Sequence, residues 1–315
     1  MKYKINPVCR KESRLRVRSV KFALTMLLYN LFLLGIALFG FEMAFNVHWN
    51  NHVDYSGATF IYLVLISLET TLVVFMVPAF TAGSLAGERE KQTLDILLTT
   101  VMTPWQIIIG KLTSSISIVL LLVGSSLPVL SLVFTVGGVG LPDLFQFVIV
   151  IFIIAFFIGS IGVLASSMFQ KTVHATVFSF GMVLLLCVGT IAVVVVAYLL
   201  QQMYYWNVMQ GEGQAPNVAW AALLLLLNPI VTMGDMIVRQ YGHATEFQNI
   251  IRQMGGLPEI IVNGWFYLSL LVQMVFAGGC LYLAQRMLNP LRRPGRKLWR
   301  RKKKKTALDE RMYFG

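Results

Sequence analysis

The feature that most constrains this chain is a series of six apolar stretches, each long enough to form a helix that crosses a lipid bilayer. Such a helix needs about 20 mostly apolar residues. Stretches of this length and character lie at residues 22–41, 60–80, 112–136, 144–168, 173–200 and 260–284. The sequence therefore predicts an all-α polytopic membrane protein with six transmembrane helices.

The charge of the chain agrees with this prediction once its distribution is considered. The 315 residues are 57% hydrophobic and 13% charged, whereas a soluble domain has about 25% charged residues. The net charge of +12 divides into +7 at residues 1–21, +10 at residues 286–315 and −5 in between. A positive net charge is also typical of nucleic-acid-binding proteins. Because these charges flank an apolar body, we interpret them as marks of membrane orientation and expect no nucleic acid as a partner.

The distribution of lysine and arginine predicts the orientation of the spans, because cytoplasmic segments of membrane proteins are enriched in these residues. With six spans and a cytoplasmic N-terminus, the cytoplasmic segments hold 24 Lys and Arg residues, and the external segments hold only Arg239 and Arg252. A seventh apolar run at residues 218–227 is too short to span a bilayer and stops at Asn228-Pro229. Counting it as a span would place the basic C-terminus outside. We therefore predict cytoplasmic N- and C-termini and a re-entrant or interfacial segment between spans five and six.

Three regions follow from this topology. They are a basic cytoplasmic N-terminal interfacial helix at residues 1–21, a six-span transmembrane domain at 22–285 with an external loop at 201–259, and a polybasic cytoplasmic tail at 286–315. Basic segments of this kind are attracted to anionic lipid headgroups. The residues expected to contact membrane lipids are Arg10, Lys11, Arg14, Arg16, Arg18, Arg300, Arg301 and Lys302. An aromatic cluster at residues 204–206 suits either an interfacial belt or a lid over an exit path.

The segment between spans two and three has the pattern of a short amphipathic helix. Its apolar positions, spaced as on one face of a helix, are Leu94, Leu97, Leu98 and Val101. Lys91 and Asp95 lie on the other face at pairing distance. Thr103, Pro104 and Gln106 then predict the start of the next helix, with threonine as the cap and glutamine completing a capping box. By itself this pattern fits a surface-lying connector as well as a docking element.

With these motifs, the sequence resembles the type-2 ABC exporter permeases, six-span membrane subunits that pair with a separate ATPase. The resemblance covers residues 5–200 and rests on Asn6-Pro7, Ala86-Gly87, Glu88-Arg89, Thr93-Leu94-Asp95-Ile96-Leu97-Leu98 and Gly110-Lys111. It implies that the connector is a short cytoplasmic coupling helix, which sits in a cleft of the ATPase subunit and transmits its closure to the spans. The residues implied to couple to the ATPase are Glu88, Arg89, Glu90, Lys91, Thr93, Leu94, Asp95, Leu97, Leu98 and Val101.

Two positions depart from the pattern of that family. Gln92 stands where glycine is common, and Val101 stands where proline is frequent. Glycine and proline are the residues that most disfavour a helix interior. Both replacements therefore predict a longer or stiffer connector helix.

The chain carries no nucleotide-binding motif, since the pattern G-x-x-x-x-G-K-[ST] is absent from its sequence. We therefore expect no cofactor on this chain, and ATP and Mg²⁺ on a partner. The resemblance implies a permease of an ATP-driven exporter, itself not an enzyme, in the cytoplasmic membrane of a bacterium. The implied partners are two copies of an ABC ATPase subunit and a second permease, identical or homologous. Two alternatives stay open: a membrane scaffold or regulator without transport, and a lipid-modifying membrane enzyme.

Two features inside the spans predict how the helices pack. The small residues Gly159 and Gly162 permit span four to approach a neighbouring helix closely. Glu69 is the one acidic residue deep in a predicted span, where an ionisable group by default faces the bundle or a cavity. One interpretation is a carboxyl that helps helices to pack and is either protonated or bonded to the adjacent Thr70 or Thr71. The other interpretation is a polar point on the substrate path.

Overall fold

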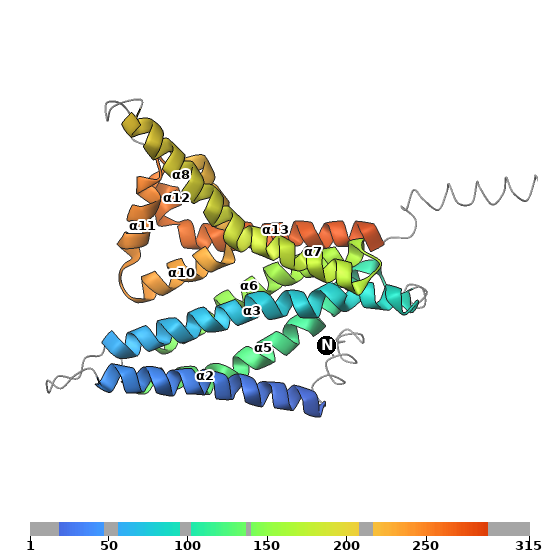
Figure 1. Cartoon of the computed structure of the whole chain (residues 1–315). Coiled ribbons are helices and arrows are strands. Elements are labelled where there is room, and N and C mark those ends of the chain that lie inside the picture. Colours follow the sequence, from blue (N-terminus) through green and yellow to red (C-terminus); the bar gives the residue numbers. More distant parts are fainter. Residues whose placement is uncertain (1–18, 47–55, 95–101, 137–139, 208–216, 289–315) are drawn as a thin grey trace, which may run out of the picture.

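The part of the chain that the structure describes is mostly helical and contains no strand (Figure 1). The structure, a computed structural model, describes residues 19–46, 56–94, 102–136, 140–207 and 217–288. Within these ranges six helical segments are long and apolar enough to cross a membrane. They are α2 (Val20–Asn46), α3 (Ser56–Glu90), α5 (Pro104–Val136), α6 (Leu141–Met168), the continuous segment of α7 (Thr172–Leu184), the π-helix η1 (Leu185–Gly189) and α8 (Thr190–Asn207), and α13 (Trp265–Leu288).

These six segments confirm the predicted fold class, and each predicted span overlaps one of them. Two helices continue beyond their apolar stretches: α3 extends to Glu90, and α5 already begins at Pro104. Span six begins later than predicted, at Trp265, because the preceding residues form a separate short helix, α12 (Glu259–Asn263). The apolar stretches therefore located the spans but not their ends.

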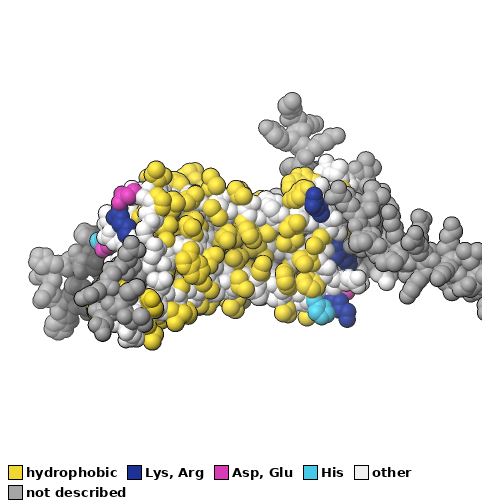
Figure 2. Space-filling view, turned by 90° about the horizontal axis from the view of Figure 1, so that it is seen from above, with side chains coloured by type: hydrophobic (Ala, Val, Ile, Leu, Met, Phe, Trp, Pro, Cys, Tyr) yellow, Lys and Arg dark blue, Asp and Glu magenta, His cyan; other side chains and the backbone are white. Residues whose placement is uncertain are grey.

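The surface of the bundle suits a membrane. We name its two ends after residues that lie there: at the Glu88 end α3 finishes and α5 begins, and at the Gln240 end lie most of residues 217–264. Figure 2 shows apolar side chains over the middle of the visible face and charged side chains toward its two ends. Soluble proteins rarely expose a continuous apolar surface of this extent. The chain is therefore a multi-pass membrane protein.

The main apolar core is centred on α3 and α6, which pack against each other and against α5 and α7. Their close approach depends on a glycine in α6. A Cβ atom built on Gly162 would lie 1.9 Å from Thr81 Oγ1 and 2.8 Å from Thr81 Cβ, and one built on Gly159 would lie 2.9 Å from Leu112 Cδ1. The predicted close approach of span four to its neighbours is confirmed at both glycines.

Residues 217–264 form a cap at the Gln240 end, with a small apolar core of its own. The helices of the cap are α9 (Ala219–Ala222), the 3-10 helix η2 (Leu223–Leu227), α10 (Pro229–Gln240), α11 (Ala244–Gln253) and α12. Its core includes Val194 of α8, Leu225 of η2 and Trp265 of α13. The chain bends by 91° between the α9–η2 segment and α10. The apolar run at 218–227 therefore does not form a straight span. This agrees with the prediction from its short length.

Asn228 stands at this bend and joins the cap to span five. It is wholly buried, and its amide nitrogen donates to the carbonyl oxygen of Cys187 at 2.7 Å and to Thr190 Oγ1 at 2.9 Å. Its side-chain oxygen accepts from the first backbone N–H groups of α10 and so caps that helix. Thr232 Oγ1 donates to the Asn228 carbonyl at 3.0 Å, and Gln273 of α13 donates to Thr232 Oγ1 at 2.7 Å. One buried network therefore connects α10 with spans five and six.

Candidate functional site at the Glu88 end

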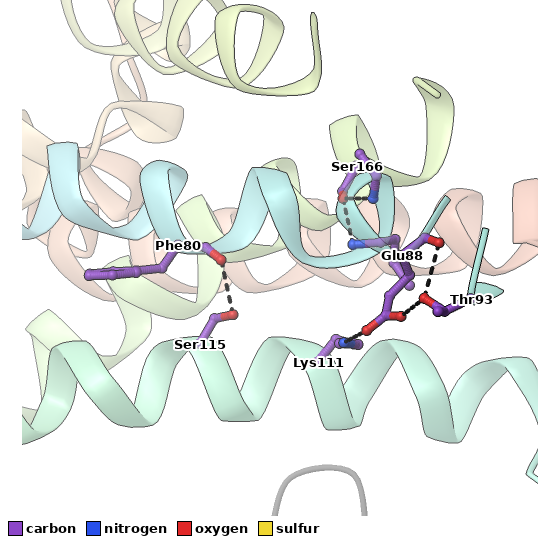
Figure 3. Close-up of polar contacts among 8 residues, drawn as sticks. Phe80, Glu88, Thr93, Lys111, Ser115 and Ser166 are labelled. Atoms are coloured by element: carbon purple, nitrogen blue, oxygen red, sulfur yellow. Dashed lines mark hydrogen bonds and ion pairs between the residues drawn. The ribbon is translucent and has the colours of Figure 1, made fainter. Parts of the chain in front are cut away.

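The end of α3 is fixed to the start of α5 by an ion pair between Glu88 and Lys111 (Figure 3). Lys111 Nζ lies 3.0 Å from Glu88 Oε1, and the hydroxyl of Thr93 donates to Glu88 Oε2. The side chain of Lys111 is 6% exposed and that of Glu88 is 31% exposed. A buried ammonium group needs a paired carboxylate, because an unpaired charge in that environment is strongly destabilising. The glutamate and the lysine of the two sequence motifs are therefore partners of each other.

The next two residues of α3 bond to other helices. Arg89 Nη1 donates to the carbonyl oxygen of Phe169, at the end of α6, at 3.0 Å. The carboxylate of Glu90 accepts from the backbone N–H of Thr172 at 3.2 Å and from its hydroxyl at 2.7 Å. Thr172 is the first residue of α7. We call Glu88, Arg89, Glu90 and Lys111 the Glu88 node, because together they join the end of span two to spans three, four and five.

Two serines from neighbouring spans bind the backbone of α3 just before the node. Ser166 Oγ of α6 accepts from the N–H groups of Leu85 and Ala86, both at 2.8 Å. Ser115 Oγ of α5 donates to the carbonyl oxygen of Phe80 at 3.2 Å (Figure 3). Sequence reasoning missed these contacts. The available signal was the presence of serines within apolar spans, where hydroxyl groups commonly hydrogen-bond to a neighbouring helix.

The connector begins with a sharp turn at Gln92. Its φ is +59°, a left-handed conformation that favours glycine, and the N–H of Thr93 bonds back to the carbonyl of Glu88 at 2.9 Å. Leu94 is 6% exposed and packs into the main core. The expectation that Gln92 lengthens the connector helix is therefore wrong, because α3 ends at Glu90 and the chain turns at the position where the family commonly has glycine.

Replacing Gln92 with glycine is expected to stabilise the protein by about 0.5–1 kcal/mol. A left-handed conformation costs a residue with a Cβ atom about 1–2 kcal/mol, and glycine loses part of this advantage through its greater freedom in the unfolded chain. Thermal unfolding of the purified protein measures the change. Gln92→Ala keeps a Cβ atom and is expected to bring no gain. A loss of stability in Gln92→Gly would show that α3 continues through this position.

The predicted start of span three is confirmed. The N–H of Thr103 donates to Gln106 Oε1 at 3.1 Å, the N–H of Gln106 donates to Thr103 Oγ1 at 3.3 Å, and α5 begins at Pro104. The structure thus brings together Glu88, Arg89, Glu90, Thr93 and Leu94, and places Lys91 at the exposed turn. The other residues singled out lie outside the described residues: Asp95, Leu97, Leu98, Val101, Arg10, Lys11, Arg14, Arg16, Arg18, Arg300, Arg301 and Lys302. Contact of the whole set with an ATPase or with lipids stays a prediction.

Glu69 lies wholly buried where α2, α3 and α5 meet. Its Oε1 accepts from the hydroxyl of Tyr29 at 3.3 Å and from the hydroxyl of Ser126. The adjacent Thr70 and Thr71 bond instead to backbone carbonyls of their own helix. These contacts connect three spans and favour the packing interpretation, with different partners from those expected. A place for Glu69 on the substrate path stays a prediction.

The described part of the chain has six candidate membrane spans, and its second span ends in a charged node before a short connector. The family profile described as ABC-2 family transporter protein matches residues 7–284, and the chain belongs to this family. It is accordingly a permease of the type-2 ABC transporters, the membrane subunit that works with an ABC ATPase and is not itself catalytic. The alternative of a lipid-modifying enzyme is thereby set aside. A comparison with curated proteins finds no match.

Proposed function

We propose that this chain is the permease of an ATP-driven exporter in a bacterial cytoplasmic membrane. Two permeases, identical or homologous, and two ABC ATPase subunits form the complex, and the ATPase subunits bind ATP and Mg²⁺. The Glu88 end faces the cytoplasm, in agreement with the 24 Lys and Arg residues in the segments assigned to that side. The cap then lies on the external side, where the substrate leaves.

The observation that carries the proposal is the position of the Glu88 node directly before the connector. The node gathers the ends of α3, α5, α6 and α7 within hydrogen-bonding distance. The connector continues from Leu94, which is packed in the main core. A force applied to the connector therefore reaches four helices through bonded and packed side chains. Rigid helices that move together in this way are what a coupling segment requires.

Affinity purification of the tagged permease, co-expressed with the ABC ATPase encoded nearest to it, tests the proposal. We expect the ATPase to co-purify and its ATP hydrolysis to depend on the permease. Leu97→Asp is expected to lower this hydrolysis at least tenfold, because a charge on the apolar stripe prevents docking. The matched control is Leu141→Asp, the same change at the exposed start of α6 at the Gln240 end, which is expected to retain activity.

Two outcomes would contradict the proposal. If the purified complex contains no nucleotide-binding subunit, the chain does not work with an ABC ATPase and the proposed function is wrong. If an ATPase co-purifies but its activity is the same with and without the permease, the chain acts as a membrane scaffold or regulator.

A further inference from the structure

α3 carries a polar contact near each of its two ends. It finishes in the Glu88 node, and Tyr62, six residues after its start at Ser56, reaches the cap. Tyr62 and Glu88 lie 26 positions apart, which corresponds to about 39 Å along an α-helix. The helix is continuous between them, although it contains Pro78, and it runs from one end of the bundle to the other (Figure 1). A displacement of α3 at the node is therefore expected to move Tyr62 as well.

Gln240, the last residue of α10, is hydrogen-bonded to both α3 and α6. Its Oε1 accepts from the hydroxyl of Tyr62 at 3.3 Å. Its Nε2 donates to the carbonyl oxygen of Asp143 at 3.0 Å and to Gln146 Oε1 at 3.3 Å. Asp143 and Gln146 belong to the first turns of α6. One side chain thus holds the outer ends of two spans against the cap.

The other contacts of α10 join it to the core and to spans five and six; Thr232, for example, accepts from Gln273 of α13 at 2.7 Å. Met233, Met236 and Ile237 pack into the main core, and apolar packing is non-directional. Asn228, at the opposite end of α10, is bonded to span five and not to α3. Hydrogen bonds, by contrast, weaken steeply when their distance and angle change. The three bonds of Gln240, together with the adjacent hydrogen bond between Tyr241 and the backbone of Leu63 in α3, are therefore the contacts of the cap that are most sensitive to a shift of α3.

We propose that Gln240 is a latch that holds the cap in one position on α3 and α6, and that a displacement of α3 at the Glu88 node releases it. The proposal rests on the proposed function, because the ATPase supplies the displacement. The three bonds are 3.0–3.3 Å long, so a shift of about 1 Å breaks them. Gln240 acts as a positioning residue: it sets the resting position of the cap and leaves the cap free to move once α3 has shifted.

The test measures the distance between α3 and the cap in the reconstituted complex of permease and ATPase. Spin labels are attached to cysteines at Phe60 of α3 and Ile250 of α11, both exposed, after Cys9, Cys187 and Cys280 have been replaced by alanine. Labelled permease is diluted with unlabelled permease so that distances between subunits do not contribute. Distance distributions are recorded without nucleotide and with ATP and vanadate.

We expect one distance without nucleotide and a second, longer distance with ATP and vanadate. In Gln240→Ala the longer distance is expected already without nucleotide, its population raised at least about tenfold by the loss of three hydrogen bonds. Tyr62→Phe, which removes one of the three bonds, is expected to have a smaller effect. Gln240→Glu keeps the acceptor for Tyr62 and loses the two donated bonds, so it should lie between them. Gln253→Ala, at an exposed position of α11, is the control and should leave the distribution unchanged.

Each remaining outcome decides against the latch or against the proposed function. If nucleotide shifts the distance but Gln240→Ala equals the parent without nucleotide, the latch is wrong and the proposed function stands. If the distance never changes while the permease still stimulates ATP hydrolysis, the cap does not move and the latch is wrong again. If no ATPase binds the permease, the proposed function itself fails. Melting temperatures of all variants, measured in parallel, separate a released cap from an unfolded protein.

Discussion

Replacing Lys111 with glutamate is expected to abolish stimulation of the partner ATPase and to destabilise the permease by about 3 kcal/mol. The change places a second carboxylate against Glu88, at a position where the lysine side chain is 6% exposed. Glu88 itself is 31% exposed, so water screens part of the repulsion and keeps the cost below that of a fully buried pair. Thermal unfolding of the permease and ATP hydrolysis by the reconstituted complex measure the two effects.

The exchange of both charges, Glu88→Lys with Lys111→Glu, separates an ion pair from a mere loss of packing. Opposite charges are restored, so about half of the lost stability should return. Recovery stays incomplete because a lysine at position 88 cannot accept the hydrogen bond from Thr93. Lys111→Met is the matched control, since methionine keeps an unbranched apolar stem and removes the charge. A double variant no more stable than Lys111→Glu alone would show that the two residues do not act as a pair.

The second large effect is expected at Gly162. Gly162→Leu should prevent the bundle from folding, and Gly162→Ala should lower the stability of the protein by about 1–3 kcal/mol. An added Cβ atom would lie 1.9 Å from Thr81 Oγ1 and 2.8 Å from Thr81 Cβ. The hydroxyl can rotate away, but the Cβ atom can retreat only if the backbone of α3 moves. The yield of monodisperse protein and its melting temperature measure the loss.

Gly124→Ala is the matched control for this prediction. Its added Cβ atom meets nothing within 4 Å, so the variant should be neutral or more stable by up to about 1 kcal/mol, because alanine favours a helix more than glycine does. Combining Gly162→Ala with Thr81→Gly removes both clashing atoms and should recover stability relative to Gly162→Ala. If Gly162→Ala is tolerated as well as Gly124→Ala, α3 and α6 do not pack as closely as described.

The parts of this fold that were predictable from the sequence are those determined by neighbouring residues. A run of apolar residues identifies a span wherever it lies, and the capping box of Thr103 and Gln106 forms between residues three positions apart. The stop at Asn228-Pro229 likewise follows from local chemistry, since proline suits the first turn of a new helix. The capping box and the bend lie at the predicted positions in the structure, and each predicted span overlaps a helix there.

The partners of the polar residues could not be predicted, because they come from distant parts of the chain. Glu88 pairs with a lysine 23 positions away, and Glu69 pairs with Tyr29 and Ser126 on two other spans. The expected threonines near Glu69 bond within their own helix, as hydroxyls in apolar spans readily do. Only the packing of the helices decides which of many possible partners a buried polar group meets.

Gln92 shows that tertiary contacts can also override a local preference. Glutamine favours a helix, but the burial of Leu94 and the bonds from Thr93 to Glu88 require the chain to turn at this position. The left-handed conformation of Gln92 is the result. The helix preference of glutamine therefore predicted a helical residue at position 92, whereas the contacts of Thr93 and Leu94 impose a turn.

Span five shows how much of this architecture depends on the number of residues between two points. A π-turn holds one residue more than an α-turn, and each residue of an α-helix rotates the chain by about 100°. η1 therefore turns the whole of α8 about the axis of the span, and in this phase Thr190 faces Asn228 and Val194 enters the core of the cap. With one residue fewer, the same side chains would face other directions. The position of the cap therefore depends on the length of the segment Leu185–Gly189.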